Sequence, residues 1–243
     1  MTQPLSSHGT LLEIGDGAGT FGSVTQTGSG TDDMIVSTPE AAYSGHDDIT
    51  VRVELQTEGT PDTIRYSIDG GVSWERSDIE IPGVDTPIFL QDGIYVEFAT
   101  TTGHTAADYW EFTATAVFTT LAEVVDIGGP TFSQSVFDAP SQEVTWQKRV
   151  AGIVSAGEVT FGLNFIPKNA THDDSTGILS KLGDIGDSAY RLRFNDAGTG
   201  TKSEWRFSGF LTGFEHDLPV DGIAMANVTI TINGQPSFTK GSS

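Results

Sequence analysis

Two short runs of histidine and aspartate are the first residues in this sequence that could do chemistry. Residues 46–48 and residues 172–174 both read His-Asp-Asp, which places an imidazole beside two carboxylates. Both groups bind several divalent metal ions. The runs match neither the HExxH pattern of zinc peptidases nor the calcium loop of EF-hands. We therefore expect no metal site at either run, and a solvated loop at residues 46–48.

A short helix explains the second run better than a metal does. Residues 173–175 are Asp, Asp and Ser, which are side chains that cap helix N-termini. Apolar residues at helical spacing follow at 178, 179 and 182, and Gly183 provides a C-terminal stop. The pattern predicts a short α-helix whose N-terminus is capped by Asp173, Asp174 or Ser175.

A further candidate is the sequence SIDGGVSW, which fits the S-x-D-x-G-x-[ST]-W pattern of the Asp-box hairpin. Its pattern residues are Ser67, Asp69, Gly71, Ser73 and Trp74. In such a hairpin the Asp caps turn amides, the Gly permits a positive φ angle, and the Trp covers the core. The motif is similar to hairpins of sialidases, but a single copy without an arginine cluster carries no catalysis. We expect a structural turn, with sugar binding as the alternative.

Enzymatic chemistry finds no support in the sequence. No Ser, His and Asp set has a recognisable nucleophile context, and among 33 Asp and Glu residues no catalytic pair stands out. The glycine-rich residues 15–19 lack the helix and lysine of a phosphate-binding loop. With no cysteine, the chain can form neither disulfides nor thiolate metal sites. We expect a protein that is not an enzyme and that needs no cofactor.

The elements that position the Asp-box hairpin read as strands throughout residues 21–117. Residues 49–56 alternate apolar and polar side chains, as a strand with one buried face does. Further strands are predicted at residues 64–68, 74–81, 93–101 and 109–117. This spacing is typical of an immunoglobulin-like β-sandwich of about 100 residues.

Charge is unevenly distributed along the 243 residues. The chain has 12 Lys and Arg against 33 Asp and Glu, a net charge of −21. Residues 21–117 hold 17 acids and three arginines, so that only −7 remains for the rest of the chain. This argues against tight nucleic-acid binding, which needs cations to neutralise phosphates. The sequence also predicts neither a membrane span nor a signal peptide.

A long polar loop stands out in the second half of the chain. Roughly 25 residues separate two apolar strands, whereas hairpin loops usually have about 2 to 5. Phe137 and Trp146 are among the apolar residues spaced through the loop, and loops of this kind usually contact another surface. The flanking core-facing strands are predicted from Val124, Val125 and Ile127, and from Val159, Phe161, Leu163 and Phe165.

Later strands show one apolar and one charged face. Residues 190–194 alternate Tyr, Leu and Phe with two Arg, and residues 204–208 alternate in the same way. The charged face is either a solvated outer surface or, as the resemblance described next implies, an intersubunit or channel-facing sheet. Residues from 236 onward are expected to form a loose tail, and residues 1–9 either a frayed terminus or a segment that docks on a neighbouring subunit.

Residues 120–238 resemble the major tail tube protein of long-tailed, non-contractile (siphovirus-type) phages. The resemblance rests on AEVVDIGGPTFS, on a long arm ending in WQKRVAGIVSAGEVTFGLNF, on HDDSTGILSKLG, and on the run from AYRLRFNDAG to NGQPSF. It implies a small β-sandwich with one helix. It also implies assembly into stacked six-fold rings whose inner strands close a barrel around the DNA channel.

The resemblance also defines a domain organisation. In tail tube proteins the first strand leads quickly into the next, but here roughly a hundred residues intervene, and loop tips tolerate such insertions. We predict a discontinuous tail tube domain, 1–20 and 118–243, and an inserted Ig-like decoration domain, 21–117. The predicted fold is mainly β: a tail-tube β-sandwich or barrel with one short α-helix, plus the inserted β-sandwich.

The long loop, residues 132–154, is then an arm that contacts neighbouring subunits or the next ring. Aromatic residues dominate interface hot spots, and Lys148 with Arg149 is the one adjacent pair of cations in the sequence. The predicted contact residues are Phe132, Phe137, Asp138, Glu143, Trp146, Lys148 and Arg149. The alternative is an arm folded back on its own sandwich.

We therefore expect a structural virion protein, the major tail tube subunit, made in the host cytoplasm. Its expected partners are further copies of the chain, with the tape measure protein and double-stranded DNA in the lumen without specific DNA binding. Host-surface glycans are a further candidate partner of the insert. The competing hypothesis is a carbohydrate-binding or adhesin-type β-sandwich module.

Overall fold

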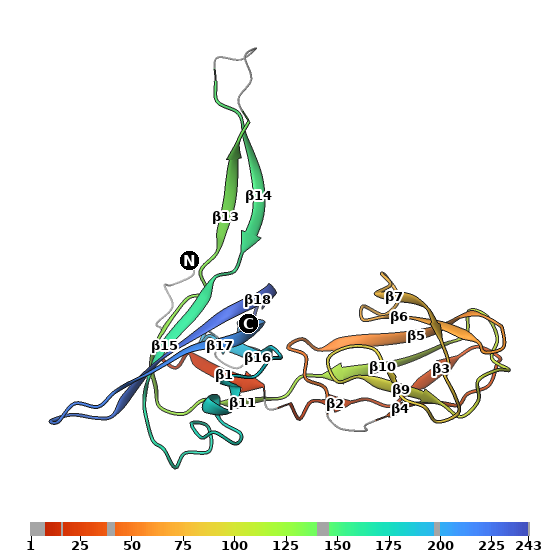
Figure 1. Ribbon diagram of the computed structural model, residues 1–243, viewed down its shortest axis with the longest axis horizontal. Coiled ribbons are helices and arrows are strands. Elements are labelled where there is room, and N and C mark those ends of the chain that lie inside the picture. Colours follow the sequence, from red (N-terminus) through yellow and green to blue (C-terminus); the bar gives the residue numbers. More distant parts are fainter. Residues whose placement is uncertain (1–7, 16, 38–41, 140–145, 197–199, 243) are drawn as a thin grey trace. The chain divides into compact units, whose positions relative to one another are not determined.

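The computed structural model describes residues 8–15, 17–37, 42–139, 146–196 and 200–242 (Figure 1). The contacts divide the chain into two compact units. Unit 1 comprises Met1–Ile14 and Thr119–Ser243, and unit 2 comprises Gly15–Phe118. These junctions lie close to the boundaries 20/21 and 117/118 that the sequence predicts. That unit 2 folds by itself stays a prediction.

Unit 2 is built from strands that form two sheets. One sheet has the order β2-β10-β5-β6-β7, with β3 also paired to β10, and the other has the order β4-β9-β8. The strands are β2 (Thr20–Phe21), β3 (Thr25–Thr27), β4 (Met34–Ser37), β5 (Ile49–Thr57), β6 (Thr63–Ser67), β7 (Arg76–Glu80), β8 (Ile88–Phe89), β9 (Tyr95–Phe98) and β10 (Tyr109–Thr115).

The core of unit 2 lies between these sheets. Val51, Val53 and Leu55 of β5 are buried at every second position, as their alternation predicts, and they share one cluster with Phe98 and Trp110. The mainly β fold predicted for this segment is therefore confirmed. The immunoglobulin-like identity of the sandwich stays a prediction.

Unit 1 contains one seven-stranded antiparallel sheet and a separate two-stranded one. The order of the large sheet is β11-β1-β16-β17-β18-β15-β12, and β13 pairs with β14. The strands are β1 (Leu11–Gly15), β11 (Phe118–Thr120), β12 (Val124–Gly128), β13 (Ser133–Asp138), β14 (Arg149–Ser155), β15 (Glu158–Asn164), β16 (Ser188–Arg193), β17 (Glu204–Asp217) and β18 (Met225–Thr239). Within the described residues the sheet does not close into a barrel.

The core of unit 1 forms on one face of the large sheet. It includes Leu12, Phe161, Tyr190, Phe207 and Val228, which are all nearly inaccessible. β1 and β11 are neighbours in the sheet, and the Leu121 amide donates to the Leu12 carbonyl at 2.9 Å. The chain therefore leaves unit 1 at the end of one strand and returns on the adjacent one.

Two strand predictions need correction. Val125 does not face the core, because the pairing of β12 with β15 shifts register between Val124 and Asp126, and a bulge of this kind turns the extra residue outward. The residues after 235 are not a loose tail: β18 runs to Thr239, and Phe238 pairs with Trp205 of β17. Strand pairing over this length leaves little freedom at that end.

The predicted α-helix is a single 3-10 turn, η1 (Ile178–Lys181), and no side chain caps it. Asp173 instead caps the preceding turn, where one carboxylate oxygen accepts the amides of Ser175, Thr176 and Gly177 at 2.8–3.2 Å. His172, which the capping prediction did not address, is fully buried. Its ring accepts the Ile166 amide and donates to the Ala122 carbonyl, which fixes this loop to the sheet.

The Asp173 turn predicts a pH-dependent stability. Hydrogen bonds from the amide of Thr176, and then of Gly177, lower the pKa of Asp173 from 3.8 to about 2. A lowered pKa stabilises the folded state above the unfolded value, and the contribution disappears as the pH falls through the folded value. Asp173→Ala should therefore lower the melting temperature of unit 1 above pH 4, and the difference from wild type should vanish towards pH 2. An equal difference at all pH values, or the same profile for Asp174→Ala, would contradict this.

Candidate assembly surfaces

The long loop predicted from the sequence is a projecting β-hairpin, here called the arm. β13 and β14 pair with each other from Ser133↔Ser155 to Asp138↔Arg149, and with no other strand among the described residues. Figure 1 shows the arm rising from the large sheet of unit 1. Every residue of β13 is exposed, and Gly152 is the one residue of β14 that is half-buried. An isolated two-stranded hairpin is marginally stable in water, so this arm needs a surface to contact.

The aromatic residues predicted as anchors lie on this arm. Trp146 is 85% exposed and Phe137 is 62% exposed. The Phe137 ring lies across Gly152 of the opposite strand, where an added Cβ would come within 2.4 Å of the ring. Glycine at 152 therefore leaves room for the Phe137 ring, which stays mostly exposed.

The arm is not folded back on its own sandwich. Phe132, at its base, is the arm aromatic that packs on the large sheet, with its ring 5.2 Å from that of Trp205. Farther out, Val136, Phe137 and Val150 are more than half exposed. The structure thus favours an arm available for contacts over the folded-back alternative.

Two of the charged residues predicted to contact a neighbouring subunit pair with each other within the single chain. Arg149 pairs with Asp138 across the hairpin at 3.2 Å, and both side chains are well exposed. Lys148 is exposed next to them, and its carbonyl accepts the Ala139 amide at 2.8 Å. Glu143 lies outside the described residues. An exposed pair of this kind contributes little to stability, so it can exchange partners at small cost.

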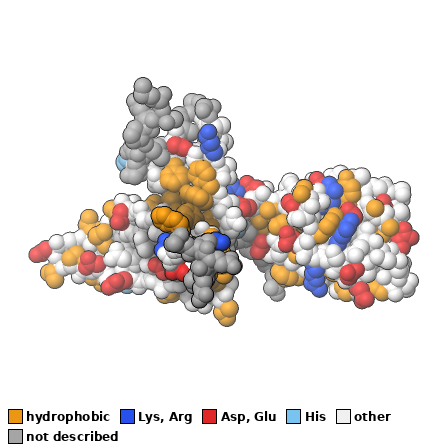
Figure 2. Space-filling model, turned by 90° about the horizontal axis from the view of Figure 1, so that it is seen from above, with side chains coloured by type: hydrophobic (Ala, Val, Ile, Leu, Met, Phe, Trp, Pro, Cys, Tyr) orange, Lys and Arg blue, Asp and Glu red, His pale blue; other side chains and the backbone are white. Residues whose placement is uncertain are grey.

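A groove lies where the arm joins the sheet, and we call it the base groove. Its volume is about 720 Å3, and no charged side chain lines it. The lining residues are Phe132, Ile153, Val154, Ser155, Ala156, Trp205, Ile232, Gly234, Gln235 and Pro236. In the view of Figure 2, hydrophobic side chains gather in a cluster on unit 1, whereas on unit 2 they are scattered among charged ones.

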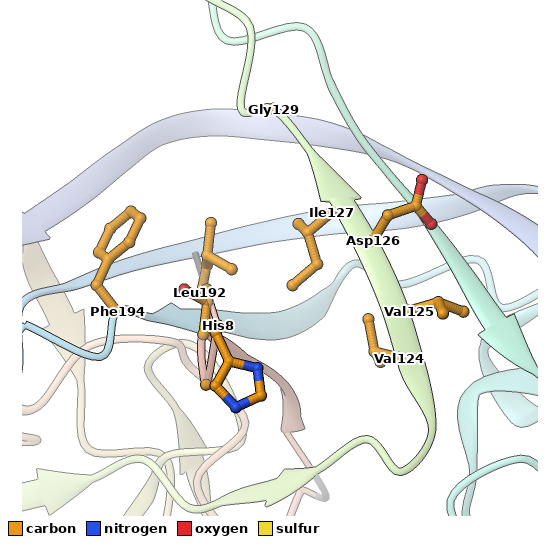
Figure 3. Close-up of a pocket in the computed structure, with 10 residues that line it drawn as sticks. His8, Val124, Val125, Asp126, Ile127, Gly129, Leu192 and Phe194 are labelled. Carbon is orange, nitrogen blue, oxygen red and sulfur yellow. The ribbon is translucent and has the colours of Figure 1, made fainter. Parts of the chain in front are cut away.

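A second pocket, of about 670 Å3, follows a strand edge (Figure 3). Consecutive residues 124–127 of β12 line one side, and residues 8–10 with Leu192 and Phe194 line the other. β12 is an end strand that pairs only with β15 in the described part of the chain. An unpaired strand edge is a template for pairing with another chain.

The charged face of β16 and β17 forms an ion-pair network. Glu13 of β1 is buried and pairs with both Arg191 and Arg193, while Glu204 pairs with Arg206 at 2.7 Å. The face is thus organised by its own side chains rather than freely solvated. Its position in an assembly, outside or towards a channel, stays a prediction.

The Asp-box residues form a structural turn. The Asp69 carboxylate accepts the amides of Val72 and Ser73 at 2.9–3.0 Å, and the Ser67 and Ser73 hydroxyls at 2.6 Å. Hydrogen bonds from the Ser67 and Ser73 side chains hold the pKa of Asp69 well below its usual range. Gly71 has a φ of 94°, as the pattern requires. The carboxylate is therefore engaged within the turn.

Trp74 does not cover the core of unit 2 as predicted. Its ring is half-buried, and the Arg65 guanidinium lies 4.0 Å from the ring centre. Trp74 lies in the loop between β6 and β7, outside the buried cluster. Its ring therefore packs against the Arg65 guanidinium in a cation-π contact and not against the core.

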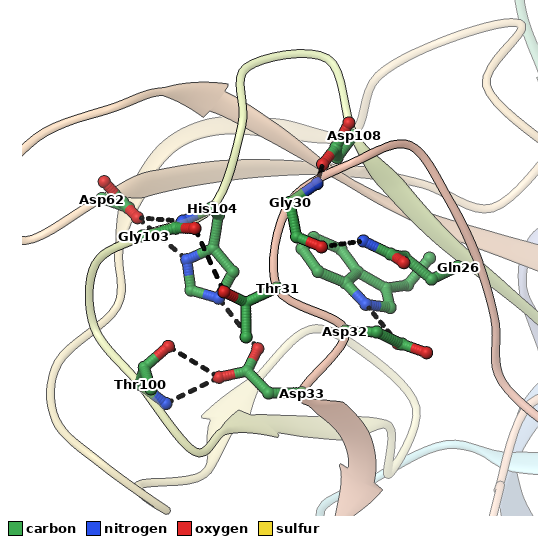
Figure 4. Close-up of polar contacts among 11 residues, drawn as sticks. Gln26, Gly30, Thr31, Asp32, Asp33, Asp62, Thr100, Gly103, His104 and Asp108 are labelled. Atoms are coloured by element: carbon green, nitrogen blue, oxygen red, sulfur yellow. Dashed lines mark hydrogen bonds and ion pairs between the residues drawn. The ribbon is translucent and has the colours of Figure 1, made fainter.

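Unit 2 contains a buried His-Asp cluster that no sequence pattern indicated (Figure 4). His104 is buried, its Nδ1 lies 2.8 Å from Asp62, and its Nε2 lies 2.8 Å from Asp33. Both ring nitrogens can donate at the same time only in the cationic form of the ring, in which each nitrogen carries a hydrogen. The rings of Phe98 and Trp110 enclose the imidazole edge-on. The cluster joins three segments far apart in the sequence.

Among the described residues, no group of three or more His, Asp or Glu side chains could hold a metal ion. His46 pairs with Asp47 at 3.5 Å, and Asp48 accepts the Ala116 amide, so this loop is bonded to its surroundings. No helix in the described ranges is long and apolar enough to cross a membrane.

Comparison with known proteins places this fold in a family. The family model described as "Lambda phage tail tube protein, TTP" matches residues 102–239, which is more than half of the 243-residue chain. The match covers the arm, the base groove and strands β11 to β18. A search of curated proteins found no match. Tail tube proteins are structural components of the virion tail, which is consistent with a protein that is not an enzyme. This chain belongs to the lambda phage tail tube protein family.

Proposed function

We propose that the chain is a major tail tube subunit that polymerises into stacked hexameric rings, and that the rings form the channel for ejection of double-stranded DNA. The arm is the observation that carries this proposal. It presents Phe137 and Trp146 to solvent on a hairpin whose strands, within the described residues, pair only with each other. The free edge of β12 supplies a second surface, at which sheets of neighbouring subunits can pair.

The proposed lumen holds the tape measure protein and then DNA without specific binding. DNA carries one charge per about 1.7 Å of its axis, so a wall rich in Lys and Arg would hold it in place. Outside residues 21–117 the chain has only 9 Lys and Arg against 16 Asp and Glu, a net charge of −7. An acidic or neutral wall lets the DNA slide. We place the assembled subunit in the virion tail, with assembly in the host cytoplasm.

Electron microscopy of the purified chain over a range of concentrations tests the proposal. We expect rings, and tubes at high protein concentration, because the arm, the base groove and the β12 edge offer more contact surface than a monomer needs. A species that stays monomeric at every concentration and salt would contradict the proposal.

Unit 2 is proposed to decorate the outer wall and to be dispensable for assembly. Its own core and its acidic composition support this role. Replacing residues 21–117 by a short Gly/Ser turn should leave a folded chain that still forms tubes, as judged by circular dichroism and microscopy. A folded chain without tubes would show instead that the insert belongs to the assembly core. Binding of glycans by the insert stays a prediction.

A further inference from the structure

A second projection of unit 1 ends in an apolar tip. β17 and β18 form a long hairpin that extends from the sheet (Figure 1), and residues 218–224 connect them. We call this connection the tip. Leu218 is 68% exposed, Val220 100% and Ile223 66%. Three exposed aliphatic side chains on one turn are unusual for a surface that meets only water.

The base groove has complementary properties. Its lining is uncharged and includes the rings of Phe132 and Trp205, whose centres lie 5.2 Å apart. The Phe238 ring is not part of the lining, but its centre lies 4.9 Å from that of Trp205. Phe132 and Phe238 are each about half exposed. A cavity of about 720 Å3 with such a wall can receive several aliphatic side chains.

The tip of a chain cannot reach the base groove of the same chain. Trp205 and Pro236 line the groove at one end of the β17–β18 pair, and the tip lies at the other end. β17 has 14 residues, so at about 3.4 Å per residue it separates the two ends by roughly 45 Å. The two strands stay paired along this length. The two apolar surfaces can therefore meet only between copies.

The two ends of the hairpin also differ in charge: the tip is acidic and the groove end carries lysines. Glu215, Asp217 and Asp221 surround the tip, and the sequence has no Lys or Arg from 207 to 239. At the groove end, the chain terminus is held beside residues 201–203, because Gly241 donates to the Ser203 hydroxyl and Ser242 to the Thr201 carbonyl. Lys202 and Lys240 therefore lie at the same end of the sheet as Trp205. Opposite charges at the two ends favour contact between unlike ends.

We propose that the tip of one copy docks in the base groove of a neighbouring copy, with Lys202 and Lys240 facing the acidic residues of the tip. This inference rests on the proposed tube function and names one contact within it. The contact is head-to-tail, because each copy offers a tip on one side and a groove on the other. A head-to-tail contact generates a ring when the rotation between copies closes.

Engineered cysteines test this contact, because the natural chain has none. Val220→Cys and Gln235→Cys each replace an exposed side chain, one on the tip and one in the groove. One variant carries a size tag, and the two are mixed under assembly conditions and oxidised. We expect a disulfide-linked heterodimer on a non-reducing gel. Val72→Cys of unit 2, also exposed, is the matched control in place of Val220→Cys and should give none.

A charge exchange gives a second readout. Asp217→Lys with Asp221→Lys should raise the protein concentration needed for assembly by at least about tenfold. Adding Lys202→Glu and Lys240→Glu should restore it. Tubes without the heterodimer, or without any effect of the charge reversal, overturn this inference and leave the proposed function standing. If the natural chain forms no rings at all, the proposed function fails and this contact fails with it.

Discussion

Replacing Phe137 and Trp146 together by alanine is expected to yield a folded monomer that no longer forms tubes. Both side chains are more than 60% exposed, so their removal should change the free energy of unfolding by no more than about 0.5 kcal/mol. At an interface, aromatic anchors of this kind each contribute about 2 kcal/mol or more. Thermal melting and electron microscopy of the same preparation measure the two effects separately.

Matched variants make this result specific to the arm. Phe89→Ala removes an aromatic ring of similar exposure, 52%, from unit 2 and should leave assembly unchanged. Gly152→Val keeps both aromatic residues but displaces Phe137, because an added Cβ overlaps the ring, and it should impair assembly. Lys148→Glu together with Arg149→Glu should suppress tube formation without changing the melting temperature of the monomer. Tubes of normal length, or a loss of about 3 to 5 kcal/mol in monomer stability, would disprove the role of the arm.

The second large effect is expected at the buried cluster of unit 2. His104→Leu should destabilise unit 2 by about 3 to 5 kcal/mol, because it leaves two carboxylates enclosed without their partner. Asp33 and Asp62 are each within 2.8 Å of the ring, and their side chains are at most 9% exposed. The melting transition of unit 1 should not move, and tubes should still form.

A triple variant separates the effect of charge from the effect of packing. Adding Asp33→Asn and Asp62→Asn to His104→Leu removes the uncompensated charges and should recover part of the stability. Hydrogen bonds from the Gly59 amide and from His104 lower the pKa of Asp62 in spite of its burial. The wild-type advantage should therefore be present above pH 3.8 and decline at lower pH. Equal stability of His104→Leu and wild type at neutral pH would refute the argument.

Alternation along a strand was the most reliable guide to the fold. Val51, Val53 and Leu55, and likewise Val159, Phe161 and Leu163, are buried as their spacing predicts. The prediction that Val125 faces the core was wrong because of a bulge. Where a bulge forms depends on the paired strand, and the periodicity of a single strand carries no information about that strand. The predicted α-helix is a 3-10 turn, and Asp173 caps the turn before it instead of its N-terminus. Sequence spacing cannot distinguish these two capping arrangements.

The sequence predicts the arm, but neither the base groove nor the His104 cluster. Loop length and the residue types at 137 and 146 were sufficient to indicate the arm. The base groove combines residues from four separate segments, so no local pattern reveals it. The His104 cluster is similar: Asp62 and Asp33 are 42 and 71 residues away in sequence, and only the folded sandwich joins them.

The adjacency of β1 and β11 has an evolutionary consequence. Because the chain leaves unit 1 and returns to it on neighbouring strands, unit 1 requires of the segment between them only that its two ends lie close together. The following consequence rests on the proposed tube function. A foreign domain whose termini meet this condition can take the same place by recombination or by design. Each tube would then display one copy of the new domain per subunit, at the spacing of the lattice, without any change to the residues that build the tube.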